Sequence, residues 1–280
     1  MLLATIRART FDDVQAMTFR TLALLAGLTL LCALPVRADE LGLICPDRPG
    51  KGTSPCTLAG GHAQAELGLF DESFQRRAGT TTDTGNAGSL LAKWGMSDRM
   101  DVEAGMALYQ FQRVHDASGT ATSSGIGDLF LHAKYNPLAG DGPFALVLDP
   151  FLKLPTAGGG LGNGAVEGGL VLPMGYDLGN NWSLAMTPEA DILLNAAGTG
   201  HHANLVDVVG LGKSFGPFSL GVEVWSDQNL DPAGAISQYS FDLDAAWLAN
   251  NDTQLDGGVN IGLNRATPDL EIYFGISRRF

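Results

Sequence analysis

The chain has 280 residues, of which 45% are apolar and 17% charged, and its formal net charge is −13. This length holds one large β domain or two smaller domains, and the apolar content argues against a disordered chain. The acidic balance argues against nucleic acid as a partner, because proteins that bind nucleic acid need basic patches.

The N-terminus contains a long apolar run. Residues 21–36, TLALLAGLTLLCALPV, carry no charge, and roughly 16 residues is short for a membrane-spanning helix of about 20. Ala38, with Val36 two positions before it, fits cleavage by signal peptidase after Ala38. Residues 1–38 are therefore predicted to be a secretory signal peptide with a helical core.

The start of this signal peptide has two alternatives. Met17 begins a more typical signal than Met1, in which case residues 1–16 lie upstream of the true start. The sequence leaves both starts open. A lipoprotein signal through Cys32 is a weaker alternative, because Leu31 stands where a small residue is expected.

Two cysteines remain after cleavage of the signal peptide. Cys45 and Cys56 flank the sequence PDRPGKGTSP. In an oxidising, secreted compartment this spacing predicts a disulfide that closes a loop rich in proline and glycine. His62 alone does not complete a metal site and there is no CxxCH haem motif, so no cofactor is expected. Residues 39–60 are predicted to form a periplasmic segment clipped by this disulfide.

Beyond residue 60, apolar and polar residues alternate with a period of two. In PFALVLDPFLKLP, residues 143–155, the leucines share one face while Asp149 and Lys153 share the other. The pattern predicts about twelve strands, most of them longer than soluble strands and close to the roughly 9–11 residues of a tilted membrane-spanning strand. The predicted ranges are 61–70, 86–96, 101–111, 125–136, 143–155, 164–177, 181–193, 202–214, 218–227, 236–249, 253–264 and 268–280.

The predicted connections alternate in length. Those after even-numbered strands are brief, at 97–100, 138–142, 179–180, 216–217 and 250–252. Those after odd-numbered strands are longer, at 71–85, 112–124, 156–163, 194–201 and 228–235, with 265–267 as the exception. Short turns on one side and long loops on the other are typical of an outer-membrane barrel whose short turns are periplasmic. We therefore predict an all-β fold, a closed antiparallel transmembrane β-barrel over residues 61–280, with both termini in the periplasm.

Closure of the sheet follows from the membrane environment. Lipid offers no hydrogen-bond partner to backbone groups, so the first strand, 61–70, is expected to pair with the last, 268–280. The terminal Phe280 is predicted to lie at the periplasmic interface and to belong to the signal that the barrel-assembly machinery reads. Further interface aromatics are predicted at Trp94, Tyr135, Trp182 and Trp247.

Residues 202–214 fit the alternation least well. Leu205 and Val209 share a face with Asp207 and Lys213. Either the register slips there through a bulge, or part of the interior is apolar.

Three stretches carry a family resemblance. The stretches GIGDLFLHAKYNPL (125–138), KWGMSDRMDVEAGM (93–106) and LDGGVNIGLNRATPDLEIYFGISRRF (255–280) resemble strands of an outer-membrane transporter family of Gram-negative bacteria associated with the meta-pathway of phenol degradation. The resemblance covers residues 60–280 and implies an outer-membrane β-barrel with a transport function. These motifs are structural hairpin patterns rich in glycine and aspartate, so they do not identify the transported solute.

The polar faces of the strands define the candidate site. If the apolar faces contact lipid, the polar faces project into the lumen, where acids outnumber bases. One interpretation is a water-filled passage that favours cations or polar neutral solutes over anions. The alternative is a narrow barrel filled by charges that pair across strands. The predicted lumen-lining residues are Glu103, Asp128, His132, Lys134, Asp149, Lys153, Glu167, Glu189, Asp191, Glu223, Asp242, Asp244, Asp256, Glu271 and Arg279.

The predicted function is passive uptake of small molecules through the barrel, with hydrophobic or aromatic solutes as candidates. The expected partners are outer-membrane lipid, the small-molecule solute and the barrel-assembly machinery. A structural barrel that binds a periplasmic partner through residues 39–60 is the alternative. The same segment could instead fold into the barrel as a small plug.

A hydrolase is a weaker alternative. His115 and the pair His201 and His202 lie in predicted loops, and Asp116 and Ser118 are near the first of them. No GxSxG motif supports a nucleophile, and loops are polar in any case. Adjacent histidines on a strand also point in opposite directions, which argues against a metal pair.

Overall fold

The computed structural model describes residues 44–138 and 142–280. The predicted signal peptide, residues 1–38, lies outside the described residues, as does the start of the segment 39–60. Within the described ranges, no helix is long and apolar enough to cross a lipid bilayer. The strands belong to one compact unit, Leu41–Arg279.

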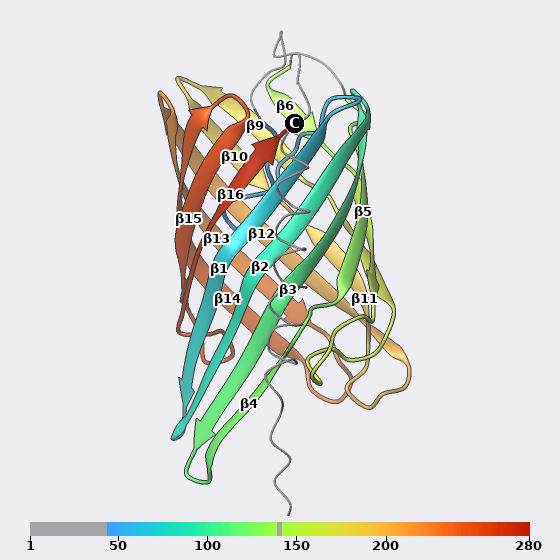
Figure 1. Cartoon of the computed structure of the whole chain (residues 1–280), viewed down its shortest axis with the longest axis vertical. Coiled ribbons are helices and arrows are strands. Elements are labelled where there is room, and N and C mark those ends of the chain that lie inside the picture. Colours follow the sequence, from blue (N-terminus) through green and yellow to red (C-terminus); the bar gives the residue numbers. More distant parts are fainter. Residues whose placement is uncertain (1–43, 139–141) are drawn as a thin grey trace, which may run out of the picture. The chain divides into compact units, whose positions relative to one another are not determined.

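The described strands form one antiparallel sheet that curls into a barrel (Figure 1). Their bounds are β1 Ala63–Arg77, β2 Thr80–Ser97, β3 Met100–Asp116, β4 Gly119–Gly125, β5 Leu129–Tyr135, β6 Phe144–Leu146, β7 Asp149–Leu154, β8 Glu167–Val171, β9 Met174–Gly179, β10 Trp182–Met186, β11 Glu189–Leu194, β12 His201–Phe215, β13 Phe218–Asn229, β14 Ile236–Asn250, β15 Thr253–Gly262 and β16 Leu270–Arg279.

The barrel is closed by pairing between β1 and β16, in which Leu67 lies opposite Ile276. The ring runs β1, β2, β3, β5, β7, β8, β11, β12 and on through β16 back to β1. The short strands β4, β6, β9 and β10 continue the wall strands that contain β5, β7, β8 and β11. The predicted fold, a closed antiparallel barrel of 12 strands, is confirmed.

Four neighbouring wall strands are interrupted within the barrel wall. The breaks lie at residues 126–128, 147–148, 172–173 and 187–188. Backbone hydrogen bonds still cross them, from Val147 N to Pro173 O and from Leu172 N to Pro188 O, both 2.9 Å. Proline has no N–H group to donate to a ladder, so Pro173 and Pro188 account for interruptions that leave the wall continuous.

The two ends of the barrel differ. Short turns at 98–99, 180–181, 216–217 and 251–252 mark one end, here named the short-turn end, and the loops 155–166, 195–200, 230–235 and 263–269 mark the other, the loop end. The alternation of short and longer connections predicted from the sequence is therefore present, with two exceptions at the loop end.

The prediction that residues 71–85 and 112–124 form loops is wrong. β1 and β2 instead continue to a tight turn at Ala78 and Gly79, and β3 and β4 to a turn at 117–118, so that two hairpins extend past the neighbouring loops (Figure 1). Ala78 and Gly79 both have positive φ, 48° and 86°, as a two-residue hairpin turn requires. Neither face of these extensions packs against lipid or a core, so the apolar alternation disappears although the threonines still favour strand.

Burial along the strands is the reverse of that in a soluble protein. Outward side chains such as Leu220 and Val224 are 54% and 51% exposed, whereas the inward Lys134 and Asp242 are 0% exposed. An apolar exterior around a polar interior is what a barrel needs in order to stand in lipid. The sequence pattern predicts both faces because lipid and lumen impose opposite polarities on alternate residues.

β12 resolves the two alternatives left open for residues 202–214. Its pairing with β13 has no shift of register. Val208, on the inward face, is buried at 3% exposure, and Asp207 lies on the opposite face with Leu205 and Val209, which are 47% and 41% exposed. Part of the interior is therefore apolar.

Candidate functional site

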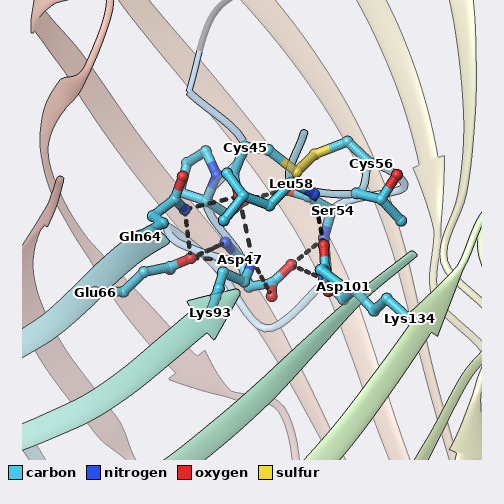
Figure 2. Close-up of a disulfide and its surroundings, with 12 residues drawn as sticks. Cys45, Asp47, Ser54, Cys56, Leu58, Gln64, Glu66, Lys93, Asp101 and Lys134 are labelled. Carbon is cyan, nitrogen blue, oxygen red and sulfur yellow. Dashed lines mark hydrogen bonds and ion pairs between the residues drawn. A yellow bond between two sulfur atoms is a disulfide. The ribbon is translucent and has the colours of Figure 1, made fainter. Parts of the chain in front are cut away.

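The interior of the barrel is crossed by residues 44–60, here named the N-terminal segment. The predicted disulfide between Cys45 and Cys56 is present and closes this segment into a loop (Figure 2). The sequence predicted a periplasmic clip and left a plug open as an alternative. The contacts of residues 44–58, described next, lie inside the barrel.

Asp47 anchors the segment to the wall formed by β1, β2, β3 and β5. Its carboxylate lies 2.6 Å from Lys93 Nζ and also accepts a hydrogen bond from Lys134 (Figure 2). The backbone N–H of Asp47 donates to Glu66 at 3.0 Å, and Lys93 lies 3.3 Å from Glu103. Burial raises the pKa of Asp47, but attraction to the Lys134 and Lys93 ammonium groups outweighs burial and holds this pKa well below its usual range.

A second set of contacts fixes the ends of the disulfide loop. The N–H of Leu58 donates to Asp101 Oδ2 at 2.5 Å, and Gln64 Nε2 donates to the carbonyl of Cys45 at 2.8 Å. Leu58 and Gln64 are 1% and 2% exposed. Because these partners lie on β1 and β3, the disulfide is held against the same wall as Asp47.

Arg48 and Lys51 contact the strands on the other side of β1. Arg48 pairs with Asp256 of β15 at 3.0 Å, and Lys51 Nζ pairs with Glu271 of β16 at 2.9 Å. The N–H of Lys51 also donates to Glu223 of β13 at 2.9 Å. The N-terminal segment thus contacts, through charged groups of opposite sign, wall strands that run from β13 through β16 and β1 to β5.

The segment approaches the wall so closely that glycine is required at its turn. Gly50 has φ +91°, and a Cβ there would lie 2.7 Å from a Glu223 carboxylate oxygen. On the interrupted wall, a Cβ at Gly175 would lie 2.8 Å from Pro55. These contacts make the segment a plug seated across the bore rather than a tether at its edge.

Cavities border the plug on two sides. One of about 430 Å³ is lined by Asp47, Arg48, Gln110 and Asp128, and extends toward the loop end. Another of about 300 Å³ is lined by Arg48 and by Lys213 and other residues close to the short turns at 180–181 and 216–217. Since Arg48 borders both, its side chain is a boundary between an outer and an inner space.

All of the predicted lumen-lining residues have buried or half-buried side chains. Those below 9% exposure are Glu103, Lys134, Asp149, Glu167, Asp191, Asp242, Asp256 and Arg279. Those of intermediate exposure are Asp128, His132, Lys153, Glu189, Glu223, Asp244 and Glu271. The structure brings them to the interior face, and their role in passage remains a prediction.

The interior charges are only partly paired. Lys153 contacts Glu167 at 2.5 Å, His132 contacts Asp149 at 3.2 Å, and Arg279 contacts Asp252 at 2.7 Å. Asp242 and Asp244, in contrast, form no ion pair among the described residues. The filled-barrel alternative therefore describes part of the interior, and β14 carries an excess of acid.

The predicted interface aromatics gather at the short-turn end. Trp94, Tyr135, Trp182 and Trp247 are 51%, 44%, 42% and 42% exposed and lie near the ends of β2, β5, β10 and β14. Phe280 directly follows β16 and is half-buried. Exposed aromatics in such a band suit the boundary between lipid and water.

The hydrolase candidates make only local contacts. His115 Nδ1 lies 2.8 Å from Thr120 Oγ1, and Asp116 accepts from Ser118 within the same hairpin turn. His202 lies near Asp231 at 3.6 Å. No cluster of three or more metal-ligating side chains is found among residues 44–138 and 142–280.

Sequence reasoning missed Asp47, Arg48 and Lys51 as site residues. The sequence does contain a signal that these residues could enter the barrel, because their charges lie inside a disulfide loop next to a barrel that has an excess of acids. Their partners, however, come from strands as far as 220 positions away. Nothing in the local pattern reveals which strand each charge meets.

Comparisons with known proteins agree with this architecture. Residues 46–280 match the family described as "Putative MetA-pathway of phenol degradation". The fold resembles an outer membrane channel from Pseudomonas putida F1, with TM-score 0.62 and 17% identity over 83% of this chain and 99% of that one. It also resembles the translocator domain of the autotransporter NalP from Neisseria meningitidis, with TM-score 0.52 and 11% identity over 96% and 98% of the two chains. No curated protein matches the sequence.

Proposed function

Because the chain belongs to the family described as "Putative MetA-pathway of phenol degradation", we propose that it is an outer-membrane channel for the passive uptake of small molecules. The observation that carries this proposal is the pair of cavities on either side of the plug, both bordered by Arg48. A solute crosses from one to the other when the Arg48 side chain or the plug moves. No chemical reaction is part of this activity.

The walls of the outer cavity favour small solutes with an apolar part. Its lining combines charged groups such as Asp47 and Asp128 with Leu91, Met106 and Phe130. Pockets that bind small organic molecules typically combine apolar walls with a few polar groups. Hydrophobic or aromatic compounds are therefore the solutes we propose.

The proposed location is the outer membrane of a Gram-negative bacterium, with the short-turn end toward the periplasm. Three observations support it: the apolar exterior, the aromatic band at the short-turn end and the length of the hairpins at the loop end. In this orientation the plug is near the periplasm, which is an oxidising compartment where disulfides form.

A structural barrel that binds a periplasmic partner is the alternative function. It would use the N-terminal segment as the binding surface. The polar groups of Asp47, Arg48 and Lys51 are already engaged inside the barrel, which disfavours this use.

Reconstitution in planar lipid bilayers distinguishes the two functions. The channel predicts a steady conductance with a preference for cations, because acids such as Asp242 and Asp244 exceed bases inside. Arg48→Ala should raise this conductance by removing the side chain shared by both cavities. A correctly folded barrel that remains silent in both forms would favour the structural role.

A further inference from the structure

An apolar groove of about 180 Å³ lies on the outer surface of the barrel, over the short strands β6, β9 and β10. The side chains that line it are Phe144, Met174, Tyr176, Leu184 and Met186. Phe144, Tyr176 and Leu184 are 45%, 47% and 37% exposed. They form one row across the wall, because Phe144 lies opposite Tyr176 and Tyr176 opposite Leu184. The groove therefore belongs to the lipid-facing surface and is separate from the bore.

Lys213 of β12 lies beside this groove on the same surface. It lies opposite Trp182 in the strand pairing, and its Nζ atom is 4.9 Å from the centre of the Trp182 ring and 5.8 Å from that of Phe215. Both rings are exposed on the outward face, so the ammonium group lies there too, although Lys213 also borders the inner cavity. The ammonium group donates to the carbonyl of Asn180 in the short turn. Lys213 is thus held at the short-turn end, where a long basic side chain can reach the boundary between lipid and water.

The charge of Lys213 is not balanced by the protein. No carboxylate forms an ion pair with it among the described residues, and in the described strands β6, β9 and β10 no outward residue is acidic. The Trp182 and Phe215 rings attract the ammonium group but carry no net charge. A cation on a lipid-facing surface is unfavourable unless an anion accompanies it, and anionic lipid headgroups supply that anion at the interface.

The cation and the groove follow one another in the order of the parts of a phospholipid. From the turn at 180–181 toward the middle of the barrel, Trp182 and Lys213 come first, Leu184 next and Met186 last. Successive outward residues of a strand are about 7 Å apart, so a phosphate at Lys213 would place the start of an acyl chain close to Leu184. The chain would then follow the groove to its end, where the wall is interrupted at 172–173 and 187–188.

We propose that this surface binds one anionic phospholipid, with its phosphate at Lys213 and Trp182 and one acyl chain in the groove along Tyr176, Leu184 and Met186. The assignment of this lipid to the periplasmic leaflet rests on the proposed location of the channel. The binding itself rests only on the outward surface described here.

The test uses the full mature chain in detergent, with its folded state checked by its altered gel mobility without heating. Native mass spectrometry measures the lipid that the barrel retains from an equimolar mixture of phosphatidylglycerol and phosphatidylcholine with identical acyl chains. The two lipids share the phosphate and the chains and differ in net charge. The unmodified protein should retain one phosphatidylglycerol, favoured about fivefold over phosphatidylcholine. Equal retention of the two lipids, or retention of neither, would overturn the proposal.

A pair of charge variants locates the headgroup. Lys213→Gln should abolish the preference for phosphatidylglycerol, whereas Arg278→Gln should leave it unchanged. Arg278 is the matched control because it is an exposed base near the same end of the barrel, on β16, which β13, β14 and β15 separate from β12. An equal loss of preference in the two variants would assign the retention to general attraction between charges and refute the site.

A second pair of variants locates the acyl chain. Leu184→Trp should fill the groove and lower the amount of retained phosphatidylglycerol severalfold, whereas Leu243→Trp should not. Leu243 is in the same row of the wall outside the groove, because Leu184, Leu211, Val222 and Leu243 lie opposite one another in turn. Equal retention in the two variants would show that no chain occupies the groove and refute the assignment.

The lipid site and the channel can fail separately. If a variant does not fold, the selectivity of the unmodified protein between the two lipids still decides. Conductance of the same preparation separates the two proposals. A conducting barrel that retains no lipid refutes only the site, and a silent barrel that retains one phosphatidylglycerol refutes only the channel.

Discussion

Asp207 shows how the membrane constrains single residues. It lies on the outward face of β12 beside Leu205 and Val209, and its Oδ1 atom is buried without a hydrogen-bond partner among the described residues. An acid on the lipid face of a barrel strand is unfavourable, although less so than a lysine or arginine. The residue therefore lowers the stability of the apolar stretch of this face around Leu205 and Val209.

Replacement of Asp207 should stabilise the barrel in lipid. We expect Asp207→Leu to raise the free energy of unfolding by about 1 kcal/mol, measured by denaturant unfolding in phospholipid vesicles. Leu243→Lys, on the outward face of β14, is the control in the opposite direction and should lower it by about 2–4 kcal/mol if the residue is near the midplane. If Asp207→Leu destabilised the barrel, the carboxylate would have a favourable partner on that face.

The pKa of Asp47 predicts how acid affects the plug. Because the Lys134 and Lys93 ammonium groups hold this pKa below the ordinary value of 3.8, the contribution of Asp47 is complete above pH 4 and is lost only as the pH falls through the lowered pKa. The difference in conductance between the unmodified protein and Asp47→Asn should therefore stay constant from pH 8 to 5 and shrink only well below pH 4. A difference that already shrinks between pH 7 and 5 would contradict this assignment.

Asp47→Asn is the matched control for this pH profile. The amide keeps the size of the side chain and removes the charge that holds both ammonium groups. Its conductance should already be raised at pH 7, and the acid-induced rise should be smaller than that of the unmodified protein. Equal acid-induced rises in the two proteins would assign the effect to other acids of the interior.

At the scale of elements, the N-terminal segment depends on its disulfide. The disulfide joins residues 11 positions apart. In the chain-entropy model, closing a loop of this size lowers the entropy of the unfolded segment and so stabilises the folded form by about 3 kcal/mol. We expect Cys56→Ser to make the plug leave the bore more often, seen as more frequent openings in single-channel recordings.

Chemical reduction provides the control for this variant. A membrane-permeant reductant should produce the same openings in the unmodified protein and have no effect on Cys45→Ser, Cys56→Ser double variants. Thiol labelling of Cys45 and Cys56 verifies that reduction is complete. Fully labelled cysteines with an unchanged opening frequency would show that the ion pairs of the plug suffice without the disulfide.

The same scale shows what the sequence could and could not predict. Strands β13 to β16 were predictable because lipid and lumen select alternate residues along them, and the seam between β1 and β16 follows from the need for closure. The hairpin that turns at residues 78–79 could not be predicted, because both faces of its strands are polar beyond the membrane. The plug was left as one of two alternatives, since a proline- and glycine-rich loop has no periodicity and its partners depend on the closed barrel.

At the scale of the whole molecule, the plug supplies positive charge to an acidic interior. It brings Arg48 and Lys51 against Asp256, Glu271 and Glu223, and contributes a single acid among these anchors, Asp47. The barrel wall and the plug are therefore electrostatically complementary. Removing the plug would leave the acids of β13, β15 and β16 without these partners, in a bore that is also wider.

Deletion of residues 46–55 should accordingly raise the conductance severalfold and also strengthen the preference for cations, measured as the reversal potential in a salt gradient. Lys51→Gln separates the two effects, because it removes positive charge while leaving the plug seated, and should shift the reversal potential with little change in conductance. A deletion variant that folds but conducts no better than the unmodified protein would show that the constriction is formed by the barrel wall. A wider pore with unchanged selectivity would show instead that the acids of the wall do not face the path of the ions.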